Sequence, residues 1–207
     1  MVNGNSELMR VIVFDLDGTL IKMNTFNIFL IYVVKRCLSQ FRLFDLVSLL
    51  MSMILRKSHL LTRAQFKKWV HRICQRYYAE PLFLNLCMKQ VNAEVLDELM
   101  KYLSDDINKV ILNTAALPYA KFLSDKLRID NCLHSYEVGG CWFENSGLNK
   151  ILSLNEVMEL ECVDVLYTDD LEDLPIIEMS ESVVMVSANI HTINKLNERG
   201  IRFRNIL

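Results

Sequence analysis

The sequence of 207 residues contains few of the residues that interrupt regular structure, with only three prolines and six glycines. It has no low-complexity run and no internal repeat, which argues against a repeat protein. Apolar residues make up 52% of the chain and charged residues 23%, so we expect a packed core rather than a disordered chain. The length suits one α/β core with one modest insertion.

Paired metal-binding or disulfide motifs are also missing. The six cysteines form no CxxC pair, and no histidine lies at zinc-ligand spacing from them. We therefore expect buried thiols in a reducing cytosol, and we assign no catalytic role to the four histidines. The first ten residues lack the apolar stretch of a signal peptide, which predicts a cytoplasmic protein.

No apolar run approaches the ~20 residues that are needed to span a bilayer. The longest is about ten residues, although segments 28–34 and 46–55 carry almost no charge. Three interpretations of this region stay open. It is a buried helical hairpin, an amphipathic surface in peripheral contact with a membrane or lipid, or a membrane span.

Charge is distributed unevenly along the chain. Residues 21–105 carry thirteen Lys or Arg and six Asp or Glu, a balance of +7, while the rest of the chain has a balance of −9. A basic segment beside an acidic one suits an anionic substrate or an anionic membrane surface, although solvated helix faces would give the same pattern. The basic segment lacks the interleaved aromatic residues of nucleic-acid-binding modules, so we expect no nucleic-acid partner.

Strand and helix patterns alternate in the first 20 residues and after residue 105. Short apolar runs rich in β-branched residues predict buried strands at 10–14, 109–113, 163–167 and 183–187. Helical patterns follow at 117–126, 148–160, 174–179 and 191–198. This alternation predicts a doubly wound parallel sheet of the Rossmann-like α/β class. Gly139 and Gly140 predict a β-hairpin at 136–144, which we expect to extend one edge of the sheet.

The segment between these parts has no such alternation. Helical patterns occur at 25–37, 41–56, 62–78 and 93–103, with Thr62 as the N-cap of the third. We therefore predict an all-helical cap domain at about 21–105, inserted into an α/β core formed by 1–20 and 106–207.

The first predicted strand is followed directly by the sequence Asp15-Leu-Asp17-Gly18-Thr19. Ligands of open α/β sheets bind at the carboxyl ends of the strands, so both carboxylates lie where a site is expected. Gly18 permits the sharp turn that lets both reach it. Asp15 could then attack a phosphorus atom, and Asp17 could donate a proton to the leaving oxygen.

This motif resembles the DxDGT motif of phosphatases in the haloacid dehalogenase superfamily, in the phosphoserine-phosphatase-like branch with a helical cap. In that family the motif, here with Gly18 and Thr19, surrounds the phosphoryl group. The resemblance implies that Asp15 forms an aspartyl-phosphate. Asp17 argues against a dehalogenase, because a halide leaves without a proton.

Three further stretches match the family's motifs in order. Thr114, at the end of a strand, is similar to the family's phosphate-binding Ser or Thr, and Ala115 follows it where serine or glycine is common. Lys150 is similar to the lysine that pairs with the nucleophile and the phosphoryl group, and its charge would offset the carboxylates and the phosphate there.

The last motif resembles the family's acidic metal-binding motif, with Thr168 in place of its glycine. The resemblance implies a Mg²⁺ cofactor, which prefers hard oxygen ligands. Its ligands would be Asp15, the backbone carbonyl of Asp17, and Asp169, with Asp173 ligating through water or orienting the shell. Asp170 stays open as an alternative ligand.

The resemblance implies a Mg²⁺-dependent phosphatase that acts on a phosphorylated small molecule or a lipid phosphate. Residues 24–30, followed by a basic and apolar stretch, are loosely similar to bacterial phosphatidylglycerophosphate phosphatases. Two alternatives stay open: a phosphotransferase or phosphomutase that uses the same two aspartates, and a non-catalytic binding module.

Overall fold

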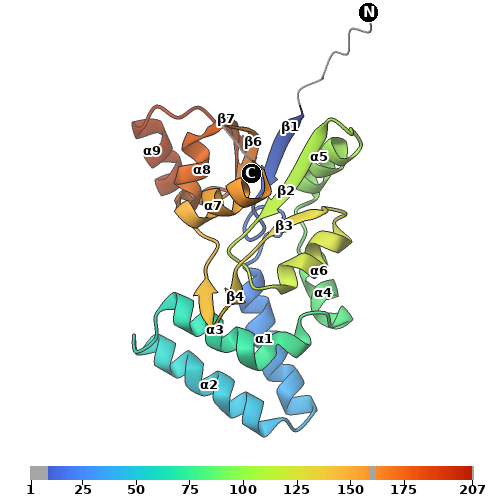
Figure 1. The fold of residues 1–207 in the computed structure, drawn as a ribbon, viewed down its shortest axis with the longest axis vertical. Coiled ribbons are helices and arrows are strands. Elements are labelled where there is room, and N and C mark those ends of the chain that lie inside the picture. Colours follow the sequence, from blue (N-terminus) through green and yellow to red (C-terminus); the bar gives the residue numbers. More distant parts are fainter. Residues whose placement is uncertain (1–8, 159–161, 207) are drawn as a thin grey trace, which may run out of the picture.

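The computed structural model describes residues 9–158 and 162–206. Figure 1 shows a sheet with helices packed on it in the upper part of the molecule and a group of helices, the cap, in the lower part. The predicted helix at 148–160 is described as far as residue 158, and the rest of that prediction lies outside the described residues.

The sheet has six parallel strands in the order β3-β2-β1-β6-β7-β8. The strands are β1 (Arg10–Phe14), β2 (Asn108–Asn113), β3 (Asn131–Leu133), β6 (Val163–Thr168), β7 (Ser180–Val186) and β8 (Arg204–Ile206). The chain moves outward from β1 to β3 and then returns to the other side of β1, so the strand order reverses between β1 and β6. The predicted doubly wound parallel sheet is confirmed.

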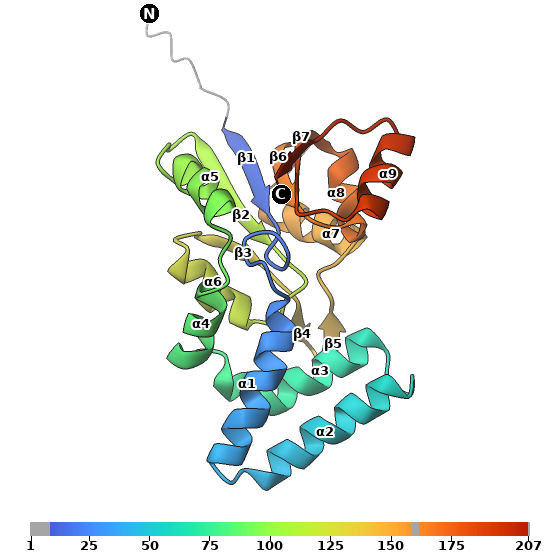
Figure 2. The same ribbon diagram turned by 180° about the vertical axis from the view of Figure 1, so that it is seen from behind.

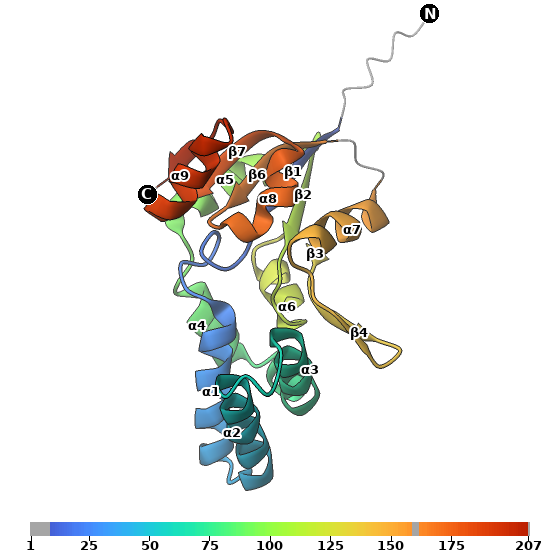
Figure 3. The same ribbon diagram turned by 90° about the vertical axis from the view of Figure 1, so that its left-hand side faces the viewer.

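Alternate residues of the strands build two cores, one on each face of the sheet. Ile12 and Phe14 face the helices α5 and α6, whereas Val11 and Val13 face α7, α8 and α9. Figures 2 and 3 show the two sets of helices on opposite faces. The helices are α5 (Ala93–Leu103), α6 (Tyr119–Lys126), α7 (Leu148–Val157), α8 (Leu174–Glu178) and α9 (Ile190–Glu198), and a 3-10 turn (Leu171–Asp173) precedes α8.

The cap consists of helices α1 (Thr25–Ser39), α2 (Leu43–Lys57), α3 (Arg63–Cys74) and α4 (Pro81–Met88), with a 3-10 turn (Gln75–Tyr77) after α3. Thr62 caps α3 as predicted, in a reciprocal capping box with Gln65. Phe29 of α1 lies 5.2 Å from the ring of Tyr119 in α6, so the apolar core of the cap continues into the core under the sheet. No helix in the described part of the chain is both long and apolar enough to cross a membrane.

Two elements lie elsewhere than the sequence suggests. The predicted hairpin, β4 (Tyr136–Val138) and β5 (Cys141–Phe143), does not extend the main sheet but forms a separate two-stranded sheet. The hairpin packs on α3 of the cap instead of pairing with an edge strand of the main sheet. Arg72 of α3 binds Glu137, and His71 of α3 contacts the ring of Trp142. Helix α5, which we predicted within the cap, packs on β2 of the sheet through its buried side.

Three short elements were not predicted. β3 and β8 are edge strands of three residues each, too short to show a period of two. Helix α4 has eight residues with Pro81 in its first turn, too few for a helical period to stand out. β7 begins at Ser180, earlier than predicted, because three polar residues at its start still pair through their backbone with β6.

Candidate active site

The two aspartates of the first motif follow β1 in a tight turn at the carboxyl edge of the sheet. Asp15 continues the strand, with its N–H donating to the carbonyl of Tyr167 at 2.9 Å. Gly18 then adopts a φ of +80°, and its N–H donates to the carbonyl of Ile21 at 2.7 Å. A side chain at Gly18 would overlap the carboxylate of Asp169, so only glycine fits this turn.

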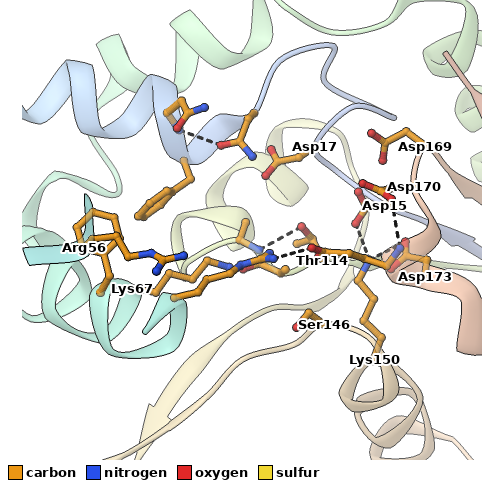
Figure 4. Close-up of a pocket in the computed structure, with 18 residues that line it drawn as sticks. Asp15, Asp17, Arg56, Lys67, Thr114, Ser146, Lys150, Asp169, Asp170 and Asp173 are labelled. Carbon is orange, nitrogen blue, oxygen red and sulfur yellow. Dashed lines mark hydrogen bonds and ion pairs between the residues drawn. The ribbon is translucent and has the colours of Figure 1, made fainter. Parts of the chain in front are cut away.

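Lys150 lies at the centre of the site and joins two carboxylates. Its Nζ is 2.7 Å from Oδ1 of Asp15 and 2.7 Å from Oδ1 of Asp173, and all three side chains are buried (Figure 4). Asp173 also accepts a hydrogen bond from the Thr168 hydroxyl at 2.8 Å. Both oxygens of Asp173 thus have a hydrogen-bond partner, and Asp173 holds Lys150 beside Asp15.

Burial shapes the acid–base properties of this group. Burial raises the pKa of Asp15 to about 8, against the opposing attraction of Lys150. For Lys150 burial acts to lower the pKa, but Asp15 and Asp173 outweigh it and raise that pKa above its ordinary value. Burial therefore favours a protonated Asp15, while the two carboxyl groups favour a charged Lys150.

Asp17 is held by the N-terminus of the first cap helix. Its Oδ1 accepts the backbone N–H of Thr25 at 2.7 Å. Burial raises the pKa of Asp17, and the hydrogen bonds from Thr25 reduce that rise. A raised pKa favours a protonated carboxyl group, which is the form that a general acid needs.

The two acids after β6 differ in their surroundings. Burial, helped by Asp170 and Asp173, raises the pKa of Asp169 to about 7, and its carboxylate lies over Gly18. The exposed Asp170 instead accepts the backbone N–H of Glu172 at 3.3 Å. Both side chains line the cavity, so Asp170 stays open as an alternative ligand.

The chemistry of these donors fits a divalent cation. Asp15 and Asp169 offer hard oxygen ligands, and a cation would favour the ionised form of both carboxyl groups, whose pKa values are raised mainly by burial. Within residues 9–158 and 162–206, no three Asp, Glu, His or Cys side chains converge as a ready-made metal cluster.

Thr114 and Ala115 follow β2, the neighbouring strand. The N–H of Thr114 donates to the carbonyl of Leu133, and its hydroxyl accepts the N–H of Ala116 at 3.2 Å. No sequence motif indicates the buried Asn145. Its amide nitrogen donates to Oδ1 of Asn113 at 2.7 Å and to the carbonyl of Thr114 at 3.1 Å.

The amide nitrogen of Asn113 in turn donates to the carbonyl of Lys150 at 3.0 Å. This buried chain of amides ties the predicted phosphate-binding strand end to the helix that carries the lysine. A lone Asn in a loop has no spacing signature, and this is why sequence reasoning missed it.

A cavity of about 400 Å³ lies between the sheet edge and the cap. Most of the predicted site residues line it, namely Asp15, Asp17, Thr114, Ala115, Lys150, Asp169 and Asp173. Gly18 and Thr19 do not: Gly18 forms the turn beneath Asp169, and Thr19 is fully buried.

The cap contributes basic side chains to the cavity. The sequence had shown only that the cap segment contains more basic than acidic residues. Arg56, Arg63 and Lys67 line the cavity (Figure 4). The Nζ of Lys67 lies 2.8 Å from both the carbonyl of Ala115 and Oε1 of Glu144. Arg63 pairs with Glu144 and Glu172, so each of these two cations has a carboxylate partner.

Comparison with known proteins gave matches among solved structures only, since neither a family model nor a curated protein matches the sequence. The structure of a Bordetella pertussis protein of unknown function aligns with 96% of this chain and 98% of its own chain, at 14% sequence identity and a TM-score of 0.70. For a haloacid dehalogenase-like hydrolase from Streptococcus pneumoniae, the alignment covers 95% of this chain and 93% of the hydrolase, at 16% identity and a TM-score of 0.56. For a phosphoserine phosphohydrolase-like protein from Francisella tularensis, it covers 91% of this chain and 93% of that protein, at 14% identity and a TM-score of 0.54.

The reversal of strand order, the acidic edge of the sheet and the helical cap define a capped, doubly wound α/β protein with a site at the carboxyl ends of its strands. Its fold is that of the haloacid dehalogenase-like hydrolases, as the sequence motifs implied.

Proposed function

We propose that this protein is a Mg²⁺-dependent phosphatase that hydrolyses phosphomonoesters through an aspartyl-phosphate on Asp15. The observation that carries the proposal is the buried Lys150, which contacts Asp15 and Asp173 within the cavity at the switch point of the sheet. The two carboxylates keep this buried lysine charged, and a buried cation at the cavity can attract the oxygens of a phosphoryl group.

In the first step, an oxygen of Asp15 attacks phosphorus and the bond from phosphorus to the leaving oxygen breaks. Asp17, whose raised pKa favours the protonated form, donates its proton to that oxygen. In the second step, Asp17 takes a proton from a water molecule, which attacks phosphorus and releases inorganic phosphate from Asp15.

The other residues hold and orient the phosphoryl group. Lys150 attracts its oxygens, and Thr114 with the backbone after it binds them at the end of β2. Mg²⁺, held by Asp15, the carbonyl of Asp17 and Asp169, would neutralise charge and fix the phosphoryl group for in-line attack. Gly18 and Thr19 serve by shaping the turn that aims both aspartates.

The substrate is a phosphorylated small molecule or a lipid phosphate, in an intracellular setting. Arg56, Arg63 and Lys67 at the cap side of the cavity support an anionic substrate. Phe26 and Phe66, which also line the cavity with ring centroids 5.7 Å apart, would contact an apolar portion of it.

The test is phosphate release from a panel of soluble and lipid phosphomonoesters, with and without Mg²⁺, for the wild type and Asp15→Asn. We expect metal-dependent release that the variant loses. Isomerisation of a sugar phosphate without phosphate release would favour a phosphomutase instead. Binding of phosphomonoesters by the folded protein without any turnover would favour a non-catalytic module.

A further inference from the structure

The outward side of helix α2 is an exposed apolar surface. Seven large apolar residues on it and on the turn before it are exposed, and we call them the outer α2 face: Phe41, Leu43, Phe44, Val47, Leu50, Met51 and Ile54. The six that lie in the helix span about 120° of its circumference and about 17 Å of its length. Phe41 and Phe44 are more than four-fifths exposed.

This face is not the side by which α2 packs on the protein. Leu46, Leu49 and Ser52 lie on the opposite side and are buried against the neighbouring helices α1 and α3. A helix that is apolar on both sides is normally buried on both sides. Contiguous apolar surface of this extent on a soluble protein marks an interaction site.

The charged residues around the face identify its partner. Helix α2 and the residue before it carry three basic side chains, Arg42, Arg56 and Lys57, and a single acid, Asp45, which already pairs with Arg42 at 3.0 Å. A second copy of this chain would bring the same positive charges together, whereas an anionic lipid surface complements them.

We propose that the outer α2 face docks the protein on an anionic lipid bilayer, with α2 lying in the plane of the headgroups. The apolar side chains enter the boundary of the acyl chains, and the basic side chains bind the lipid phosphates. Figure 2 shows α2 at the outer edge of the cap, on the side away from the sheet.

The test is co-sedimentation with vesicles of phosphatidylcholine alone and of phosphatidylcholine with phosphatidylglycerol, at low and high salt. The α2 variant is Val47→Ser with Ile54→Ser, which are 60% and 61% exposed. The matched control is Val138→Ser with Ile190→Ser, which are 63% and 72% exposed and lie outside the cap helices. Both double variants remove the same two side chains from exposed positions.

We expect the wild type and the control to bind the anionic vesicles, and the α2 variant to bind at least about tenfold more weakly. Binding should weaken at high salt and without phosphatidylglycerol. No binding of the wild type at low salt, or equal binding of the two double variants, would overturn the proposal. The proposal would also fail if analytical ultracentrifugation showed dimers of the wild type and the control but monomers of the α2 variant, because a second copy would then cover the outer α2 face. The assay needs no substrate, so its outcome is separate from that of the phosphatase test.

Discussion

Replacing Lys150 by methionine removes the cation at the centre of the site and keeps most of the side chain's length. Asp15 and Asp173 would then face each other in a buried site without the Nζ that now lies 2.7 Å from each. Removing one partner of a buried ion pair costs about 3–5 kcal/mol, because the remaining charge is left uncompensated. We expect Lys150→Met to lower the free energy of unfolding by an amount in this range at about pH 9.

The cost should depend on pH. The pKa of Asp15 is already raised to about 8 in the folded protein, so the folded state binds more protons than the unfolded state between about pH 4 and 8. Stability therefore falls as pH rises through this window. Without Lys150 the pKa of Asp15 rises further, so the variant keeps the Asp15 proton above about pH 8, where the wild type loses it. The loss of stability should therefore be larger at about pH 9 than at about pH 6, where Asp15 is protonated in both folded proteins.

The assay is urea denaturation of the wild type and the variant at both pH values, with a chelator present so that no metal replaces the lysine. Lys195→Met is the matched control, because Lys195 pairs with Glu198 at 3.4 Å on the exposed side of α9. Such a surface pair contributes less than about 1 kcal/mol. The reasoning fails if Lys150→Met costs no more than Lys195→Met, or if its cost is the same at both pH values.

Three further variants test other parts of the structure. Thr62→Ala removes the cap of α3 and should lower the free energy of unfolding by about 1 kcal/mol, measured in urea; an unchanged midpoint would contradict the capping box. Gly18→Ala should abolish phosphate release and lower the thermal midpoint, because φ is +80° and the new Cβ would overlap Asp169; full activity would contradict the turn. Phe29→Ala, in the core shared by cap and sheet, should cost about 3–5 kcal/mol in a single unfolding transition; separate transitions for cap and sheet would contradict a shared core.

Much of the fold and site could be predicted because the signals are local. Three such signals are the strand before Asp15, the turn at Gly18 and the acids after β6. Each of them spans only a few neighbouring residues of the sequence. The parallel topology then brings the ends of β1, β2 and β6 to one edge, as the alternation of strands and helices implies.

The remainder depends on contacts between distant residues. The hairpin has a turn that Gly139 and Gly140 predict, but its position on α3 depends on pairs such as Arg72 with Glu137, 65 residues apart. Asn145 and Lys67 enter the site only because folding brings β2, α3 and the loop before α7 together. For the apolar segment that contains α2, the sequence left three interpretations open, and one of them was an exposed amphipathic surface. An apolar stretch of sequence does not show which side of a helix other parts of the protein bury.

The central claim, that Asp15 is the nucleophile, is tested most directly by acid-quenching the enzyme during turnover of a substrate labelled in its phosphoryl group. We predict label bound covalently to the peptide that contains Asp15, released by hydroxylamine as expected of an acyl phosphate, and absent from Asp15→Asn. Label on another residue, or phosphate release from Asp15→Asn at the wild-type rate, would contradict the account.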